Sequence, residues 1–159
     1  MADSPLDDLQ ATLHREIPIS AQMGIAVGGY DAGRLTLQMP LAPNRNHKRT
    51  AFAGSLNALC TVTGWCLVYL LSRERQEFGD VVIRRSSIKF LQPVDGDVIM
   101  ATTEQLDPAL VDYFAEMLLE KGQAKLDLRV EVPGIDGPAV CFAGSYVVLE
   151  SRLLDGVGE

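Results

Sequence analysis

Two asparagines and a pair of small residues stand close together in the first third of the chain. Asn44 and Asn46 belong to a polar stretch, and Ala53 and Gly54 open a long apolar segment. If that segment is a helix, its first backbone N–H groups are unpaired and carry partial positive charge. Ala53 and Gly54 would leave those groups open to a ligand. The pattern is typical of an oxyanion hole, in which one donor contributes about 3 kcal/mol.

The same residues also have a purely structural explanation. Asparagine and glycine are frequent in loops because they tolerate unusual backbone angles, and Thr50 has the position of a helix cap. Asn57, one turn into the apolar segment, could line a pocket or fill a polar gap inside the fold. The residue types alone leave both explanations open.

The apolar segment from Phe52 to Leu71 contains no charged residue over 20 positions. This length approaches that of a bilayer span, but serine, threonine, asparagine and glycine residues interrupt it, and strands are expected after it. We therefore predict a helix buried in a soluble fold, from about Phe52 to Gln76. Thr61 on this helix could orient a ligand, or its hydroxyl could bond back to a carbonyl one turn earlier.

A basic cluster at residues 45–49 contrasts with the rest of the chain, whose formal net charge is -7. Its two arginines, histidine and lysine could meet phosphates or an acidic protein surface, or could form a solvated loop. Arg84 and Arg85 could extend the cluster, although alternation along a strand predicts that only one of them shares its face.

Composition argues against several classes of protein. A chain this acidic is not expected to bind nucleic acids generally. Its three cysteines, at positions 60, 66 and 141, form no CxxC pair, and with only two histidines they predict no metal site. Sparse cysteines without a signal-peptide pattern predict reduced thiols in a cytoplasmic protein, with Cys60 and Cys66 as core residues.

Alternating apolar and polar residues predict strands on both sides of the helix. Arg34–Met39 and Lys125–Val132 alternate strictly. Further strands are expected at 24–30, 81–91, 97–105 and 139–149, with an amphipathic helix over 5–15. Pro108–Glu120 could be a short helix or an irregular lid.

Six antiparallel strands and one helix without a polar side pack best when the sheet curls around the helix. We therefore predict an α+β hotdog fold in a single domain over residues 1–159. Residues 1–20 would be an N-terminal helical segment, and 150–159 a loose tail. Such a sheet leaves an edge strand exposed, which predicts at least a homodimer, or a dimer of dimers.

The stretch from Asn46 to Gly54 resembles the active-site segment of hotdog thioesterases, where Asn, two spacers, Gly-Thr, one spacer and His-Gly-Gly enter the central helix. The run from Thr50 to Leu67 resembles one subfamily more closely. That subfamily also occurs as the C-terminal domain of some acetyltransferase fusions, and its members have been assigned malonyl-acyl-carrier-protein decarboxylase activity. The resemblance covers about Leu13 to Leu149.

The resemblance implies a set of roles for the residues of this chain. The catalytic candidates are Asn46 and Thr61, with the backbone of Ala53 and Gly54 as oxyanion donors. The implied substrate is an acyl carrier protein or coenzyme A thioester that carries its own phosphopantetheine, so no cofactor is expected. Substrate contacts are expected from Asn44, Phe52, Ser55, Asn57 and Trp65, and phosphopantetheine or carrier-protein contacts from Arg45, Lys48 and Arg49.

Three departures from the thioesterase pattern bear on the chemistry. Phe52 takes the place of the histidine, Arg49 that of a glycine, and Thr61 that of the carboxylate on the central helix. Hydrolysis therefore lacks its usual base, whereas loss of carbon dioxide from a malonyl thioester requires an oxyanion hole and a dry pocket. We expect malonyl-acyl-carrier-protein decarboxylation, with thioester hydrolysis or non-catalytic acyl binding as the alternatives.

Overall fold

The computed structural model describes residues 4–74 and 79–149. The helices are α1 (Pro5–Glu16), α2 (Pro18–Gln22), α3 (Ala53–Glu74) and α4 (Pro108–Lys121), with a single 3-10 turn over Ala42–Asn44 in these ranges. The strands are β1 (Ala26–Asp31), β2 (Arg34–Pro40), β3 (Asp80–Phe90), β4 (Val98–Thr103), β5 (Gln123–Pro133) and β6 (Pro138–Leu149). The expected tail, 150–159, lies outside the described residues.

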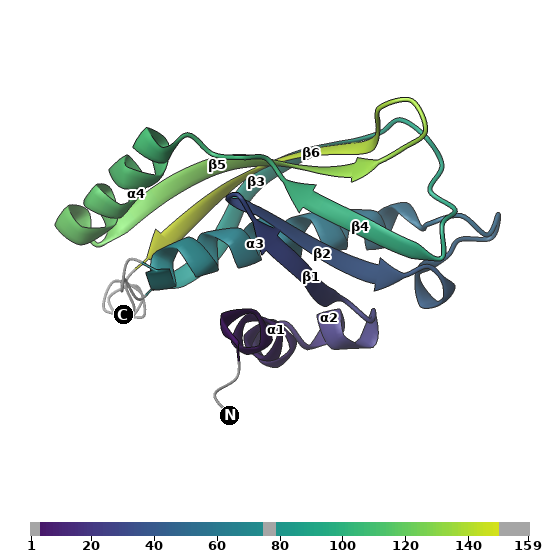
Figure 1. Cartoon of the computed structure of the whole chain (residues 1–159), viewed down its shortest axis with the longest axis horizontal. Helices are drawn as coiled ribbons and strands as arrows, with labels where there is room; N and C mark the ends of the chain where they lie inside the picture. Colours follow the sequence, from purple (N-terminus) through teal and green to yellow (C-terminus); the bar gives the residue numbers. More distant parts are fainter. Residues whose placement is uncertain (1–3, 75–78, 150–159) are drawn as a thin grey trace, which may run out of the picture.

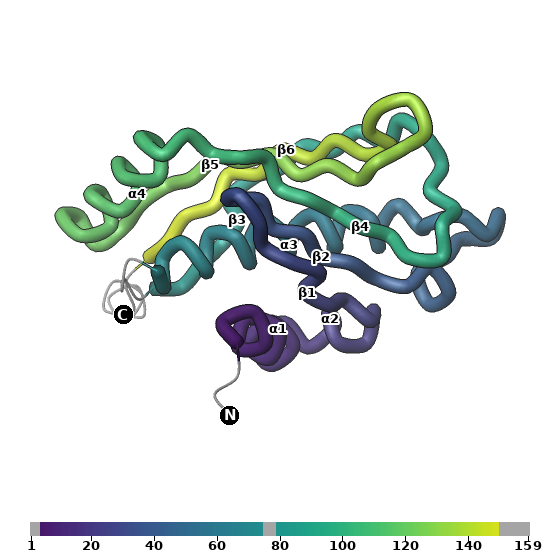
Figure 2. The backbone as a smooth tube through the Cα atoms, in the orientation of Figure 1, coloured from purple at the N-terminus to yellow at the C-terminus, as the bar shows by residue number. Residues whose placement is uncertain are grey.

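The six strands form one antiparallel sheet in the order β1-β2-β4-β5-β6-β3. α3 lies beneath the β5–β6 pair in Figure 1 and contacts every strand from β2 to β6. Along β5 the residues facing α3 are buried and those between them are exposed, as strict alternation predicts. Figure 2 follows the chain around this core. The predicted hotdog fold is confirmed.

The apolar sequence of α3 is explained by its burial inside the curved sheet. α3 is long and apolar enough to cross a bilayer by length and composition alone, yet 61% of its most apolar window is buried inside the fold. Gly64 allows the sheet to approach closely, because a Cβ at this position would collide with the Tyr146 hydroxyl. Tyr146 donates that hydroxyl to the carbonyl of Thr61 at 2.7 Å.

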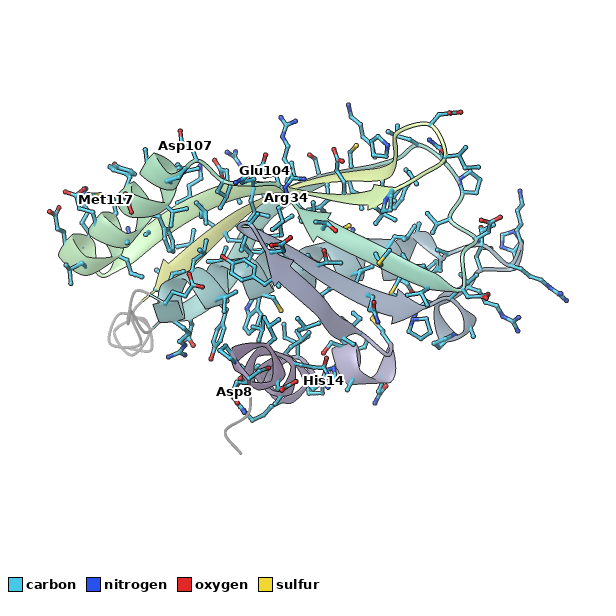
Figure 3. The ribbon with its side chains drawn as sticks, viewed as in Figure 1. Asp8, His14, Arg34, Glu104, Asp107 and Met117 are labelled. Carbon is cyan, nitrogen blue, oxygen red and sulfur yellow. The ribbon has the colours of Figure 1, made fainter. Side chains whose placement is uncertain are left out.

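α1 closes one side of the fold next to β1. Ser4 caps α1 in a capping box with Asp7. His14 Nε2 lies 2.6 Å from the carbonyl oxygen of Ile25 (Figure 3), and Val27 N–H donates to Gln10 at 2.9 Å. These contacts hold α1 against the sheet edge, so that its C-terminal turn faces α3 across an open space.

The segment that could be either a helix or a lid is the helix α4. Asp107 accepts from the N–H of Ala109 as the N-cap, and Gly122 ends the helix with a φ of 70°. Phe114 and Leu118 are buried, and α4 contacts β5. Figure 1 shows α4 over the N-terminal end of β5.

One expectation about β3 is wrong. The register against β6 pairs Ile83 with Tyr146 and then Arg85 with Ser145, so Arg84 is the extra residue of a β-bulge. A bulge interrupts the alternation of side chains. Arg84 and Arg85 consequently line the same concavity on the sheet instead of opposite faces.

Candidate functional site

The loop before α3 is organised by its two asparagines. Asn44 is 2% exposed, and its amide donates to the carbonyls of Met23 and Pro40, both at 2.8 Å. Its own carbonyl accepts from the N–H of Phe52 at 2.8 Å. Asn44 therefore anchors the loop between β2 and α3, and its side chain points into the fold.

Asn46 is half-buried at the centre of the loop. Its side-chain oxygen accepts from the N–H groups of Lys48 and Thr50, and its amide donates to Thr50 Oγ1 at 2.9 Å. The second amide contact, to the carbonyl of Ala51, is 3.4 Å long. Because hydrogen bonds weaken with distance, this second contact is the weaker of the two that the Asn46 amide donates.

The basic cluster lies at the exposed tip of this loop. Arg45, His47, Lys48 and Arg49 are all exposed. Arg49 has a φ of 64°, in the left-handed region where the thioesterase pattern has glycine. A non-glycine residue there carries backbone strain, which the contacts of Asn46 maintain.

The first turn of α3 is open. No described residue accepts from the N–H groups of Ala53, Gly54 or Ser55, and Ala53 and Gly54 are exposed. The ring of Phe52, which is 53% exposed, lies against Gly54 so closely that a Cβ there would come within 2.5 Å of it. The chain therefore offers three unpaired N–H groups with an aromatic ring beside them.

A groove of about 600 Å³ follows the side of α3 between α1 and β3. The α3 residues that line it include Thr61, Trp65, Tyr69 and Arg73, spaced one helical turn apart. Trp65 stacks on Tyr69 with ring centroids 5.2 Å apart, and Arg73 lies over the Tyr69 ring at 4.7 Å. Trp65 also donates its indole N–H to the carbonyl of Val81 at 3.0 Å, which joins α3 to β3.

The hydroxyl of Thr61 does not bond back to its own helix backbone. Its contact is a long one, 3.4 Å, to the side-chain oxygen of Asn57, whereas Thr63 makes the usual bond to a carbonyl, that of Leu59, at 2.7 Å. The Thr61 hydroxyl thus contacts a side chain of its own helix, and Thr61 is among the residues that line the groove.

The described chain does not bring all these groups together. The groove contains Thr61 and Trp65, but its lining includes none of Asn46, Ala53 or Gly54. Thr61 lies seven positions after Gly54, which corresponds to about 10 Å along the helix. The open helix start and the groove are therefore two separate parts of one face of α3.

Two carboxylates at the groove were not among the site residues predicted from the sequence. Glu16, at the end of α1, and Asp80, at the start of β3, both line it, and both are exposed. Glu16 also pairs with Arg15 at 3.2 Å. No local motif marks either residue, because only the fold brings α1 beside β3.

The cysteines of α3 are core residues, as predicted. Cys60 and Cys66 are fully buried, and burial raises the pKa of the Cys60 thiol to about 12 and also raises that of Cys66. Neither thiol is poised as a nucleophile, because a raised pKa leaves little thiolate near neutral pH.

Comparisons with known proteins agree with the fold. Residues 6–150 match the family described as "Putative thioesterase (yiiD_Cterm)". A putative thioesterase from Shewanella oneidensis is 34% identical, with a TM-score of 0.79 over 91% of this chain and 96% of that one. A protein of unknown function from Chlorobaculum tepidum, OLEI01261, is 30% identical, with a TM-score of 0.86 over 91% and 94%.

A more distant structure shares the fold. PA5026 from Pseudomonas aeruginosa, described as a probable thioesterase, is 19% identical, with a TM-score of 0.72 over 92% of this chain and 96% of that one. The match to the family spans nearly the whole chain, and two structures share at least 30% of its residues over nine-tenths of its length. The chain belongs to the yiiD_Cterm family of putative thioesterases, with the hotdog fold.

Proposed function

We propose that the protein acts on acyl thioesters in the cytoplasm and decarboxylates malonyl-acyl carrier protein to acetyl-acyl carrier protein. One observation carries this proposal: α3 presents unpaired N–H groups at its exposed start, and no carboxylate occurs on it before Glu74. The helix can thus stabilise negative charge on a thioester oxygen, but it supplies no base to activate water.

The reaction needs little from the protein beyond that stabilisation. The bond between the malonyl methylene carbon and its carboxylate breaks, carbon dioxide leaves, and the electron pair moves into an enolate on the thioester oxygen. A proton from solvent then completes the acetyl group. Donors aimed at the enolate oxygen lower the barrier, and one such donor is typically worth about 3 kcal/mol.

We assign the donors to Ala53 and Gly54, with Asn46 as a third through its loosely held N–H. Phe52 and Ser55 border this site, and Asn44 supports it through the loop. Thr61 would orient the malonyl carboxylate by its hydroxyl, with Asn57 as its partner and Trp65 as an apolar wall. A carboxylate in place of Thr61 would repel the carboxylate of the substrate.

The basic tip of the loop would bind the acyl carrier protein. Arg45, Lys48 and Arg49 project from the same loop that leads into the open start of α3. Phosphopantetheine phosphate and the acidic surface of an acyl carrier protein are both complementary to this cluster. The substrate then brings its own prosthetic arm, and the reaction needs no other cofactor.

A homodimer would unite the two parts of the site. β3 pairs only with β6 among the described strands, and its open edge bears Ile83 and Phe90, which are 36% and 48% exposed. Pairing of two β3 edges would cover these side chains. It would also set the groove of one protomer facing the second copy, so that the loop of one subunit can meet Thr61 of the other.

Hydrolysis of the thioester is the second candidate, favoured by Glu16 and Asp80. Either carboxylate lines the groove and could hold a water molecule as a base. A third candidate, a module that binds acyl groups without turnover, would use the same groove.

One experiment separates the three candidates. The protein is offered malonyl-acyl carrier protein and a panel of acyl-CoA thioesters, and free thiol and acetyl thioester are measured by mass spectrometry and thiol titration. Acetyl product without thiol supports decarboxylation, thiol release supports hydrolysis, and binding without product supports the module. Asn46→Ala is expected to lower kcat about 10²-fold, the cost of one oxyanion donor. Full activity in this variant would remove Asn46 from the site.

A further inference from the structure

The β-bulge in β3 builds a cationic concavity on the sheet. Arg84 and Arg85 line it together with Lys125 of β5 and Ser145 of β6, around a volume of about 210 Å³. Consecutive residues of a regular strand would point to opposite faces. The bulge is therefore what places two guanidinium groups in one hollow beside an ammonium group.

Among the described residues, the only ion pair in this hollow is the one between Lys125 and Asp127. Neither Arg84 nor Arg85 forms an ion pair with a described residue. Lys125 contacts Asp127 at 3.4 Å, but both side chains are exposed, so water screens the pair. Three converging cations on a chain of net charge -7 are a local exception, and an anion would relieve their mutual repulsion.

The hollow continues into an apolar channel beneath α4. Arg84 and Lys125 also line this second space, of about 240 Å³, whose walls include Phe114, Met117 and Val147. Lys121 adds a fourth cation at its border. Figure 3 labels Met117 on α4, the helix that covers this end of β5. A cationic mouth thus leads into a space lined by apolar side chains.

This chemistry fits a ligand with an anionic head and an apolar tail. Paired arginines recognise carboxylate and phosphate oxygens, and the apolar side chains of the second space can shield part of a hydrocarbon chain from water. Because the channel is smaller than the roughly 300–1,000 Å³ of a usual drug-sized site, its occupant must be short. We propose that Arg84, Arg85 and Lys125 bind the head group of a medium-chain carboxylate or alkyl phosphate, whose chain lies beneath α4.

The proposed site is separate from the candidate active site. Tyr146 faces α3, so its neighbours Ser145 and Val147 face the opposite side of the sheet. Lys125 pairs with Val147, and Arg85 pairs with Ser145, which places both cations on this outer side. The proposal therefore does not depend on the activity assigned to α3.

Isothermal titration calorimetry with decanoate and decyl phosphate tests the site, with acetate and inorganic phosphate as tailless controls. The double variant Arg84→Ser/Arg85→Ser should weaken binding of both long ligands at least tenfold. Lys89→Ser, which removes an exposed cation from the same strand away from the hollow, should bind like the original protein. Comparing the affinities for decanoate and decyl phosphate shows whether the site prefers a carboxylate or a phosphate head group.

Met117→Glu tests the channel, because it places a carboxylate in the path of the tail and should weaken decanoate binding while the arginines remain. Circular dichroism verifies that each variant folds. The proposal is overturned if neither long ligand binds, if acetate binds as tightly as decanoate, or if Lys89→Ser weakens binding as much as the arginine variant. It is also overturned if Trp65→Ala abolishes decanoate binding, since the ligand would then occupy the groove of α3.

Discussion

At the residue scale, one departure from the hotdog-thioesterase pattern that the sequence resembles coincides with a backbone outlier. Arg49 stands where that pattern has glycine, and its φ is 64°. Left-handed backbone costs a residue with a side chain roughly 1–2 kcal/mol. The chain keeps an exposed cation at this cost, which is consistent with a role for the side chain in binding an anionic carrier.

Replacing Arg49 by glycine should therefore separate stability from binding. We expect Arg49→Gly to raise the free energy of unfolding by up to about 1 kcal/mol, because strain relief exceeds the added freedom of the unfolded chain. The KM for malonyl-acyl carrier protein should rise while kcat stays unchanged. Urea denaturation and steady-state kinetics measure the two effects. Arg34→Gly, the same change at an exposed strand position, should lower stability; a loss of stability in both variants would contradict the argument.

Gly64 makes a second prediction at this scale. A methyl group at this position would collide with Tyr146, whose hydroxyl bonds to the carbonyl of Thr61. We expect Gly64→Ala to destabilise the fold by about 2 kcal/mol, as overpacking typically does. Adding Tyr146→Phe removes the colliding oxygen and should recover part of that loss, as a double-mutant cycle in urea would reveal. Strictly additive effects would show that the two residues do not interact.

At the scale of elements, the sequence predicts those features of the fold whose cause lies within one segment of the chain. β5 and α3 were predictable because alternation and an uncharged run act within the segment itself. The bulge at Arg84 was not, because it is defined only by the register against β6. The sequence did not predict that Glu16 and Asp80 line one groove, because they are 64 positions apart along the chain. The open start of α3 was predictable because it depends only on the preceding loop and the first helical turn.

The buried thiols of α3 should make the free energy of unfolding depend on pH. Burial raises the pKa of Cys60 to about 12 from an ordinary value of 9.0. The unfolded chain then loses this proton at lower pH than the folded one, so stability is retained below pH 9 and falls as pH rises toward 12. We expect a decline of roughly 1 kcal/mol per pH unit for each such thiol. Urea titrations from pH 8 to 11 under reducing conditions measure it.

Cys60→Ala provides the comparison for that titration. The variant loses one buried thiol and leaves a small cavity whose cost is the same at every pH. Its decline above pH 9 should therefore be shallower than that of the original protein. Parallel curves would show that Cys60 does not contribute to the pH dependence.

At the scale of the whole molecule, an incomplete sheet and an incomplete site lie on the same side of the fold. Among the described strands, β3 has an open edge with exposed apolar side chains, and the groove beside it contains Thr61 but none of the proposed donors Asn46, Ala53 and Gly54. The other edge, β1, is held against α1. A second copy joined through β3 is therefore the simplest arrangement that completes both the sheet and the site.

Charges placed on this edge should separate the copies. We expect Ile83→Lys/Phe90→Lys to be monomeric in sedimentation velocity where the original protein is dimeric, because two lysines per edge repel their counterparts and can no longer bury apolar surface. Ile135→Lys, at a hairpin tip where the side chain is 94% exposed, should remain a dimer. Activity should fall with the dimer, since the proposed site draws on two subunits. A fully active monomer would show that one protomer brings its helix start and its groove together unaided.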